Sequence, residues 1–376
     1  MTTNRYDVGY GTLDAFKRLA LAKAQETDRN IARLGLKVVE WTQGESVFLV
    51  EYSDHFHGQV NENLGTKNDA ADRFAEALRT VEEVGKSLST PKYDNVAQCC
   101  AAMVFNDMIT LGVLPVTMMM HLVVAQSDWF KWEKRNKELI EGWRRACDLA
   151  GTCWGGGETP ALRDLIVPGK AVISGSADGI IMPKERLIKR NIQHGDAIII
   201  LLESSGIHAN GLTLARDIAN KLPNGYLTKM PDGRMYGEAL LDPTHIYVRY
   251  IGECLERGIE IHYCVNITGH GCRKLMRAPE KFTYAIDTVP QVPTALEFIA
   301  EHGGVSLRHM YADFNMGGGF ALFVPERHVD DALLLLETGE HPFGGIRAGT
   351  IFASERSKVV ISPIGEKYDK RELQVR

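Results

Sequence analysis

Six short segments of this 376-residue chain are polar and rich in glycine, whereas the sequence around them is apolar. Glycine permits positive φ and lets backbone N–H groups approach a ligand closely, so loops of this kind often cradle phosphate oxygens. A single such loop is usually an ordinary turn. Six of them, several with a Lys, Asp, Glu or His, favour a large phosphorylated ligand. They are NLGTKND (63–69), NDMITLGVLP (106–115), GGGETPAL (155–162), ESSGIHANGLTLAR (203–216), NITGHG (266–271) and FNMGGG (314–319).

The common nucleotide-binding signatures do not account for these segments. The chain has no G-x-x-x-x-G-K-[ST] loop, and no G-x-G-x-x-G follows an expected strand. As a set, the segments resemble the motifs of the aminoimidazole ribonucleotide synthetase (phosphoribosylformylglycinamidine cyclo-ligase) family, in the family's order. The matching stretches are ENLGTK (62–67), Asn106-Asp107 with Gly112 and Pro115, GGET (156–159), SSGIHANG (204–211), PTHIY (243–247), TGHG (268–271) and the stretch 310–317.

The resemblance implies an enzyme of two domains that forms a homodimer. The N-terminal α/β domain would contribute strands to a barrel shared between subunits, and the C-terminal domain would be a ferredoxin-like α+β domain. The family reaction uses ATP and Mg²⁺ to phosphorylate the formyl oxygen of formylglycinamidine ribonucleotide. An amidine nitrogen then closes the imidazole ring, and phosphate leaves. Such phosphoryl transfer depends mainly on positioning and charge neutralisation.

The resemblance also assigns candidate site residues. Glu62 and Asp107 are the candidate metal ligands, because Mg²⁺ prefers hard oxygen ligands. Lys67 would balance phosphate charge. Together with Asp107 and Lys67, His208 is a candidate catalytic residue, because the ordinary pKa of histidine suits proton transfer. ATP and substrate would bind to Gly65, Thr66, Lys67, Asn106, Gly156, Gly157, Glu158, Thr159, Ser204, Ser205, Gly206, Asn210, Thr268 and Gly269.

Each of these side chains also has an ordinary structural interpretation. Asp107 could cap or terminate its helix, and His208 could be a hydrogen-bonded turn residue. Lys67 on its own would be a solvated loop cation, and Glu158 could be an acid near a helix N-terminus. Two further histidines are expected to be structural: His262 and His270.

Three departures from the family pattern concern the metal site. Cys99 occupies the position of a family Asp, and a thiol is a poor ligand for Mg²⁺. Glu62 and Asn63 replace the Asp-Gly pair of the family's D-G-x-G-T-K loop. The glycine-rich segment that usually precedes this loop is replaced by a stretch with one Asp and two His close together, at positions 54, 55 and 57. The changes are compatible with compensation by that Asp/His cluster, with a changed substrate or with lost catalysis.

Two alternative functions therefore stay open. One is an ATP-dependent enzyme of the same architecture that acts on a different amide or carbamoyl group, and the other is a non-catalytic nucleotide-binding subunit. Lys67, Asp107 and Glu158 argue against the non-catalytic subunit, whereas Cys99 argues for it. Selenophosphate synthetase and the hydrogenase-maturation dehydratase share the architecture, but they need a reactive Cys near the N-terminus or at the C-terminus, and this sequence has neither.

Apolar spacing predicts the elements that position these residues. In the first half we expect helices over 13–34, 72–86, 94–110 and 134–149, strands within 38–52 and over 113–124 and 171–182, a loop over 53–72 and a break at glycines 155–157. In the second half, helices over 212–221, 245–257, 292–302 and 329–338 alternate with strands over 197–202, 260–265, 320–324 and 347–351, which is typical of an α+β domain. The connector at 182–196 places the domain limits at 1–183 and 184–376.

Composition argues against several classes of partner. The formal charge is −5 and the cations are dispersed, so no basic patch marks a nucleic-acid binder. The longest apolar stretch, 104–124, is interrupted by Asn, Asp, Pro and His, which favours a buried helix and strand over a membrane span. The first residues lack the pattern of a signal peptide, and the seven cysteines form no C-x-x-C pair. We therefore expect a cytoplasmic protein with reduced thiols, a phosphorylated small-molecule substrate, and neither nucleic acid nor membrane as a partner.

Overall fold

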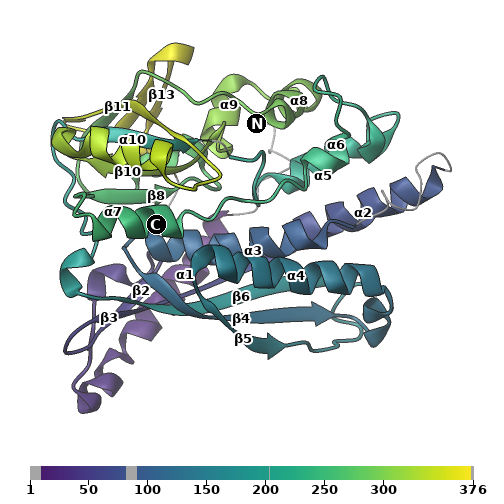
Figure 1. The fold of residues 1–376 in the computed structure, drawn as a ribbon, viewed down its shortest axis with the longest axis horizontal. Helices are drawn as coiled ribbons and strands as arrows, with labels where there is room; N and C mark the ends of the chain where they lie inside the picture. Colours follow the sequence, from purple (N-terminus) through teal and green to yellow (C-terminus); the bar gives the residue numbers. More distant parts are fainter. Residues whose placement is uncertain (1–9, 82–90, 203, 374–376) are drawn as a thin grey trace.

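The computed structural model describes residues 10–81, 91–202 and 204–373. In this part of the chain the strands form a six-stranded sheet from the first half and a seven-stranded sheet from the second half. Helices α2, α3 and α4 lie between the two sheets, and α10 lies over the second sheet (Figure 1). This arrangement confirms the expected fold class, an α/β unit followed by an α+β unit.

The first sheet has the strand order β1-β2-β3-β6-β4-β5. Adjacent strands are antiparallel except β4 and β5, which are parallel. Helices α3 and α4 lie together over one face of this sheet (Figure 1). The elements are β1 (Lys37–Val38), β2 (Phe48–Glu51), β3 (Phe56–Leu64), α2 (Thr66–Thr80), α3 (Tyr93–Ile109), β4 (Leu114–Val124), α4 (Glu133–Ala150), β5 (Cys153–Glu158) and β6 (Ala171–Ile181).

Helix α3 is the central element of this half, because it is buried between the sheet and α4 along most of its length. Gly142 of α4 lies against its first turn, where a Cβ would come within 2.2 Å of the carbonyl oxygen of Asp94. Arg145 of α4 also donates to the side chains of Asp94 and Gln98. This packing fixes the helix that carries Asp107 near its C-terminal end.

The segment 53–72 was expected to be a loop, and that prediction was wrong. It contains the nine-residue strand β3 and the start of α2. The inward side chains of β3 are those of Gly58, Val60, Glu62 and Leu64, and the polar residues between them face outward. Because glycine and glutamate occupy inward positions, the apolar alternation that marks a half-buried strand is hidden in the sequence.

The glycine run 155–157 was also expected to interrupt regular structure, whereas it lies within the edge strand β5. A Cβ at Gly157 would come within 1.7 Å of the carbonyl oxygen of Met120 on β4. Only glycine at position 157 allows the backbones of β4 and β5 to pair this closely. The glycine run therefore marks a close approach of two strands and not an interruption of regular structure.

The second sheet has the order β13-β12-β9-β11-β7-β10-β8, and all its neighbours are antiparallel except β9 and β12. The main elements of this half are β7 (Ala197–Leu202), α5 (Leu212–Ala219), α6 (Tyr236–Ala239), α7 (Val248–Glu256), β8 (Tyr263–Asn266), β9 (Phe282–Ile286), α8 (Thr294–Gly303), α9 (Leu307–Asp313), β10 (Gly318–Val324), α10 (Val329–Thr338), β11 (Gly345–Ala353), β12 (Lys358–Ile361) and β13 (Glu366–Asp369). A 3₁₀ segment, η6 (Gly271–Arg277), follows β8.

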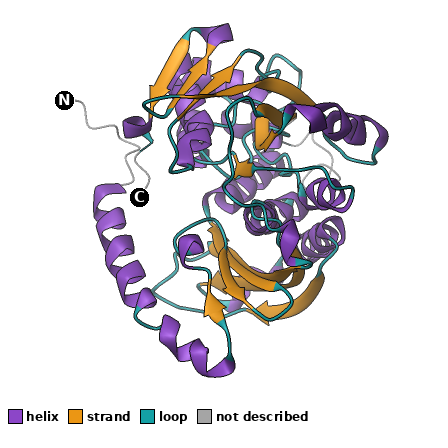
Figure 2. Ribbon diagram, turned by 90° about the vertical axis from the view of Figure 1, so that its left-hand side faces the viewer, coloured by secondary structure: helices purple, strands orange, loops and turns teal. Residues whose placement is uncertain are grey.

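The two halves contact each other through helices. Helix α3 packs on α7, and α2 packs on α5 and α6. The first helix, α1 (Tyr10–Gln25), instead stands apart from both sheets (Figure 2), and its Leu13, Phe16 and Leu19 side chains are exposed. The helix expected over 13–34 is therefore two elements, because a 3₁₀ segment (Asp28–Leu34) follows α1. No helix in the described ranges is long and apolar enough to cross a membrane.

Candidate functional site

A polar cleft lies beside the second part of β3, which pairs with a strand on one side only among the described residues. Strand β2 pairs only with residues 56–59 of β3, whereas β6 pairs with the whole strand. The cleft has a volume of about 450 Å³ and borders the second part of β3. The first half of the chain lines it with residues 44–46, Phe48, residues 59–62, Met103 and Asp107, and the second half with Asn210, Asn266, Thr268, Lys274 and Arg277.

Two carboxylates on neighbouring elements define one wall of the cleft. Glu62 is an inward-facing residue of β3, and Asp107 is in the last turn of α3. Burial, together with the negative charge of Asp107, raises the pKa of Glu62 to about 7. Lys274 and Lys17 act in the opposite direction on that pKa. Two acids that line one cleft offer hard oxygen ligands to a cation.

Asn266, the last residue of β8, connects this acid pair to the opposite wall. Its amide nitrogen donates to a carboxylate oxygen of Asp107 at 2.8 Å, and its backbone carbonyl accepts from the Lys274 ammonium at 3.1 Å. The Lys274 ammonium also donates to the Thr268 hydroxyl at 2.5 Å. Burial lowers the pKa of Lys274, whereas the carboxylates of Asp107 and Glu62 raise it. The lysine therefore faces the same space as the two acids.

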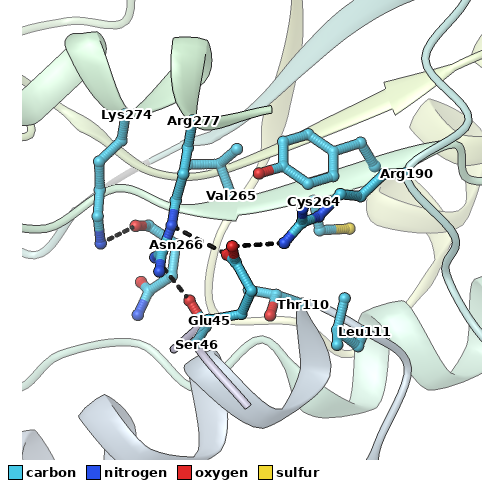
Figure 3. A pocket seen from close by; sticks show the side chains of 11 residues that line it. Glu45, Ser46, Thr110, Leu111, Arg190, Cys264, Val265, Asn266, Lys274 and Arg277 are labelled. Atoms are coloured by element: carbon cyan, nitrogen blue, oxygen red, sulfur yellow. Dashed lines mark hydrogen bonds and ion pairs between the residues drawn. The ribbon is translucent and has the colours of Figure 1, made fainter. Parts of the chain in front are cut away.

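Beside the cleft, around a smaller neighbouring pocket, ion pairs join the two halves of the chain (Figure 3). The Glu45 carboxylate lies 2.6 Å from the Arg190 guanidinium and 3.2 Å from that of Arg277. Arg277 also donates to the Ser46 hydroxyl at 3.1 Å. These contacts attach the turn before β2 to η6, so the turn and the C-terminal half form a common rim.

Sequence comparison decides the family of this chain. Residues 70–181 match the model of the AIR synthase related protein, N-terminal domain. The chain is 33% identical to the phosphoribosylformylglycinamidine cyclo-ligase of Methanothermobacter thermautotrophicus over 68% of this chain and 74% of that protein. It is 32% identical to the cyclo-ligase of Thermococcus kodakarensis over 78% of this chain and 79% of that protein. The chain belongs to the phosphoribosylformylglycinamidine cyclo-ligase family.

Solved structures at low identity share the fold. The structure of AaThiL complexed with AMPPCP and TMP superposes with a TM-score of 0.56 at 17% identity, over 91% of this chain and 93% of that one. The thiamine monophosphate kinase of Aquifex aeolicus superposes with a TM-score of 0.52 at 17% identity, over 83% and 89% of the two chains. These likenesses support the two-unit architecture of the cyclo-ligase fold and nothing finer.

The residues matched to cyclo-ligase motifs separate into two groups. The cleft brings together Glu62, Asp107, Asn210 and Thr268, which come from four different segments of the sequence. The remaining candidates do not line it. Their assigned roles stay predictions, but their contacts in the structure show what each of them does in the fold.

Lys67 lies outside the cleft lining, in the second position of α2, and its side chain has no exposed surface. Its ammonium donates to the backbone carbonyls of His208 and Asp242, both at 2.8 Å. The lysine thus joins α2 to two loops of the C-terminal half. Because the Lys67 side chain is fully buried, phosphate contact would require a change of conformation that exposes its ammonium.

His208 is also buried, with a φ of 57° and an Nε2 that has no hydrogen-bond partner among the described residues. Burial, with further contributions from His245 and Lys67, lowers the pKa of His208 well below its usual range. A Cβ at Gly319 would come within 2.7 Å of the imidazole ring. The imidazole is therefore neutral at pH 7, and the proton-transfer role remains a prediction.

Asn106 and the serine loop support the C-terminal half through backbone contacts. The Asn106 side chain donates to the carbonyl of His245 and accepts from the amide of Tyr247, so it fixes the start of α7. The Ser204 hydroxyl has one proton to donate and lies 2.7 Å from Oδ1 of Asn315 and 3.0 Å from the carbonyl oxygen of Gly206. A neighbouring hydroxyl, that of Ser205, donates to the carbonyl of Pro243.

The GGET stretch is far along the sheet from the cleft. Gly156, Gly157 and Glu158 lie on β5, and β6 and β4 separate β5 from β3. All three residues, and Thr159 after them, are exposed. The last candidates are close to the lining without belonging to it: Gly65 and Thr66 at the start of α2, and Gly269 next to Thr268.

Cys99 and the Asp/His cluster do not rebuild a metal site. The Cys99 sulfur is buried and accepts from the Thr244 amide at 3.2 Å. Within the cluster, Asp54 pairs with His55, whereas His57 approaches Asp178 at 3.4 Å. His57 is five residues from Glu62 along β3, which corresponds to about 17 Å. Among the described residues, no three His, Cys, Asp or Glu side chains form a group that could hold a metal by themselves.

Sequence reasoning missed the part of the cleft wall that comes from β8 and η6. The sequence patterns place Asn266 only at the start of a polar segment and predict no role for Lys274, Arg277 or Glu45. Lys274 and Arg277 follow the TGHG stretch by three and six residues. Two cations so close to a candidate phosphate loop are the signal that could have identified this wall.

Proposed function

We propose that this chain is an ATP-dependent cyclo-ligase that converts formylglycinamidine ribonucleotide into aminoimidazole ribonucleotide, in purine biosynthesis. The observation that carries the proposal is the pairing of the Glu62 and Asp107 carboxylates in an open polar cleft of a chain that belongs to this family. The AMPPCP molecule bound by AaThiL, which has the same fold, supports ATP as the phosphoryl donor.

The reaction needs activation because an amide oxygen is a poor leaving group. Transfer of the γ-phosphoryl group of ATP to the formyl oxygen breaks the bond to ADP and forms a phosphate ester. The amidine nitrogen then attacks the former formyl carbon, loses a proton, and expels inorganic phosphate as the imidazole ring closes. The protein contributes by holding both substrates in position and by placing charge near the phosphates.

The residues present fit Mg²⁺. This ion commonly binds through one or two carboxylates and completes its coordination with water and substrate phosphates, so Glu62 and Asp107 suffice. Asn266 orients the Asp107 carboxylate through its 2.8 Å hydrogen bond. The bound ion would supply positive charge at the phosphates. Its attraction would also favour the ionised form of Glu62, whose pKa is about 7 in the metal-free protein.

A homodimer would cover the face of the first sheet that carries no helix. Val116 and Met119 of β4 are exposed on that face, together with Gln59 and Asn61 of β3. Strand β5 is the last strand of the sheet in the described part of the chain, so it adds an exposed backbone edge of the kind that proteins normally protect. A second copy of this chain would bury both features.

The cytoplasmic location also remains a prediction.

The experiment is to incubate the purified protein with ATP, Mg²⁺ and formylglycinamidine ribonucleotide. Phosphate release and the imidazole product are followed together. We expect both to appear in equal amounts, and to be lost in Asp107→Ala. Absence of product from a protein that still binds ATP would refute the cyclo-ligase and favour a different amide substrate or a binding role.

A further inference from the structure

We propose that Lys274 is the phosphate-binding cation of the cleft, and that its ammonium contacts a phosphate oxygen of the nucleotide. The proposal rests on the proposed function in taking ATP as the ligand. The anion site itself can be tested without any nucleotide.

The first argument is the position of the ammonium group. Lys274 lines the same cleft as Glu62 and Asp107. Yet among the described residues no carboxylate oxygen lies within 4.0 Å of the Lys274 ammonium. The cation therefore faces two acids across open space. A metal ion held by the acids and a phosphate oxygen between metal and lysine would complete this alternation of charge.

The second argument is the way the lysine is held. Its ammonium has three N–H donors. One bonds to the carbonyl of Asn266 and another to the hydroxyl of Thr268, which leaves one for a ligand. Asn266 also holds the Asp107 carboxylate, so one residue sets the spacing between the acid and the cation. Such preorganisation lowers the entropic cost of binding a phosphate.

The third argument is that the other two cations near the site are either paired with an acid or sealed in the core. Arg277 is the second cation of the cleft lining, and it pairs with Glu45 at 3.2 Å and donates to Ser46. Lys67, the cation of the matched motif, is fully buried and bonded to two carbonyls. Lys274 is thus the lining cation whose charge is not neutralised by a direct ion pair.

The test uses tripolyphosphate and ATP as probes, each with Mg²⁺, and isothermal titration calorimetry on the full chain. Lys274→Gln removes the charge and keeps a polar side chain, whereas Lys274→Arg keeps the charge. Lys370→Gln is the matched control, because Lys370 also donates to a backbone carbonyl, that of Ala278, outside the cleft. Thermal unfolding of each variant establishes that it is folded.

We expect Lys274→Gln to weaken binding of both probes by about ten-fold or more, because a charge-assisted hydrogen bond is lost. Lys274→Arg should retain most of the affinity, and Lys370→Gln all of it. The proposal is overturned if the unaltered protein does not bind tripolyphosphate, if Lys274→Gln binds as tightly as the unaltered protein, or if Lys274→Arg loses as much affinity as Lys274→Gln.

The outcome is separable from that of the proposed function. If tripolyphosphate binding depends on Lys274 but no imidazole product forms from formylglycinamidine ribonucleotide, the anion site stands and the cyclo-ligase assignment falls. If the imidazole product forms while Lys274→Gln binds both probes normally, the reverse holds.

Discussion

Two lysines of this molecule occupy opposite environments. Lys67 belongs to a stretch that matches a family motif, but it is sealed in the core against the carbonyls of His208 and Asp242. Lys274 belongs to no matched motif, but it lines the open cleft opposite two carboxylates. The difference teaches that a motif locates a residue in the fold without deciding whether a ligand reaches it. The region around Lys67 is held by buried hydrogen bonds, whereas the charged groups around Lys274 line the cleft.

The largest effect should come from Lys67→Ala. The change leaves two buried carbonyls without a donor and opens a cavity, so we expect the free energy of unfolding to fall by about 3 kcal/mol. Denaturant unfolding measures it, with Lys274→Ala as the matched variant that should lose less than about 1 kcal/mol. Equal losses for the two variants would erase the distinction between the sealed lysine and the cleft lysine.

Asp107→Asn tests the cleft without disturbing the core. Asparagine has the same shape and still offers an oxygen to Asn266, so the free energy of unfolding should hardly change. Loss of one metal-ligand charge should lower the rate of imidazole formation on the order of a hundred-fold, or about 2.7 kcal/mol. A steady-state assay at saturating ATP measures this. Asp232→Asn, which removes a charge paired with Arg234 away from the cleft, is the control. A folded Asp107→Asn variant with full activity would contradict the metal assignment.

The sequence predicted those parts of the fold in which local pattern and tertiary role agree. Helix α3 was expected over 94–110 and β4 over 113–124, and both lie within a residue of those limits. Strand β3 was missed because its inward positions include Gly58 and Glu62, so periodicity carried no apolar signal. The core around α3 and the two neighbouring strands make this segment a strand, and that context is not visible locally.

The candidate site was predicted in part for a similar reason. The match to family motifs located Glu62 and Asp107, which the structure brings to one wall. It did not include Lys274, which only its closeness to the TGHG stretch marks. The contact between Asn266 and Asp107 arises from the distance between β8 and α3 rather than from any spacing in sequence. Long-range packing sets such distances, and a single sequence does not record them.

Acid sensitivity provides a smaller test of the sealed region. The pKa of His208 is lowered by burial, so the unfolded chain binds a proton at pH values where the folded chain does not. Above about pH 6.5 this difference in proton binding has no effect on the free energy of unfolding. Below about pH 6.5 the free energy of unfolding falls by up to about 1.4 kcal/mol per pH unit. Unfolding at pH 5.5 and 7.5 should show a weaker pH dependence in His208→Gln than in the unaltered protein. His194 is exposed, and His194→Gln should leave the pH dependence of the free energy of unfolding unchanged. If all three proteins show the same pH dependence, the His208 imidazole is not sealed from solvent.

The smallest expected effect concerns the rim of the cleft. Glu45→Gln removes two partly exposed ion pairs, with Arg190 and Arg277, and such pairs contribute about 0.5–1 kcal/mol in total. Because salt screens charges near solvent, the loss should shrink at high ionic strength, whereas the loss in Lys67→Ala should not. Denaturant unfolding of both variants at low and high salt measures this contrast. Equal salt dependence of the two losses would contradict the contrast and would mean that the rim is as sealed from solvent as the core around Lys67.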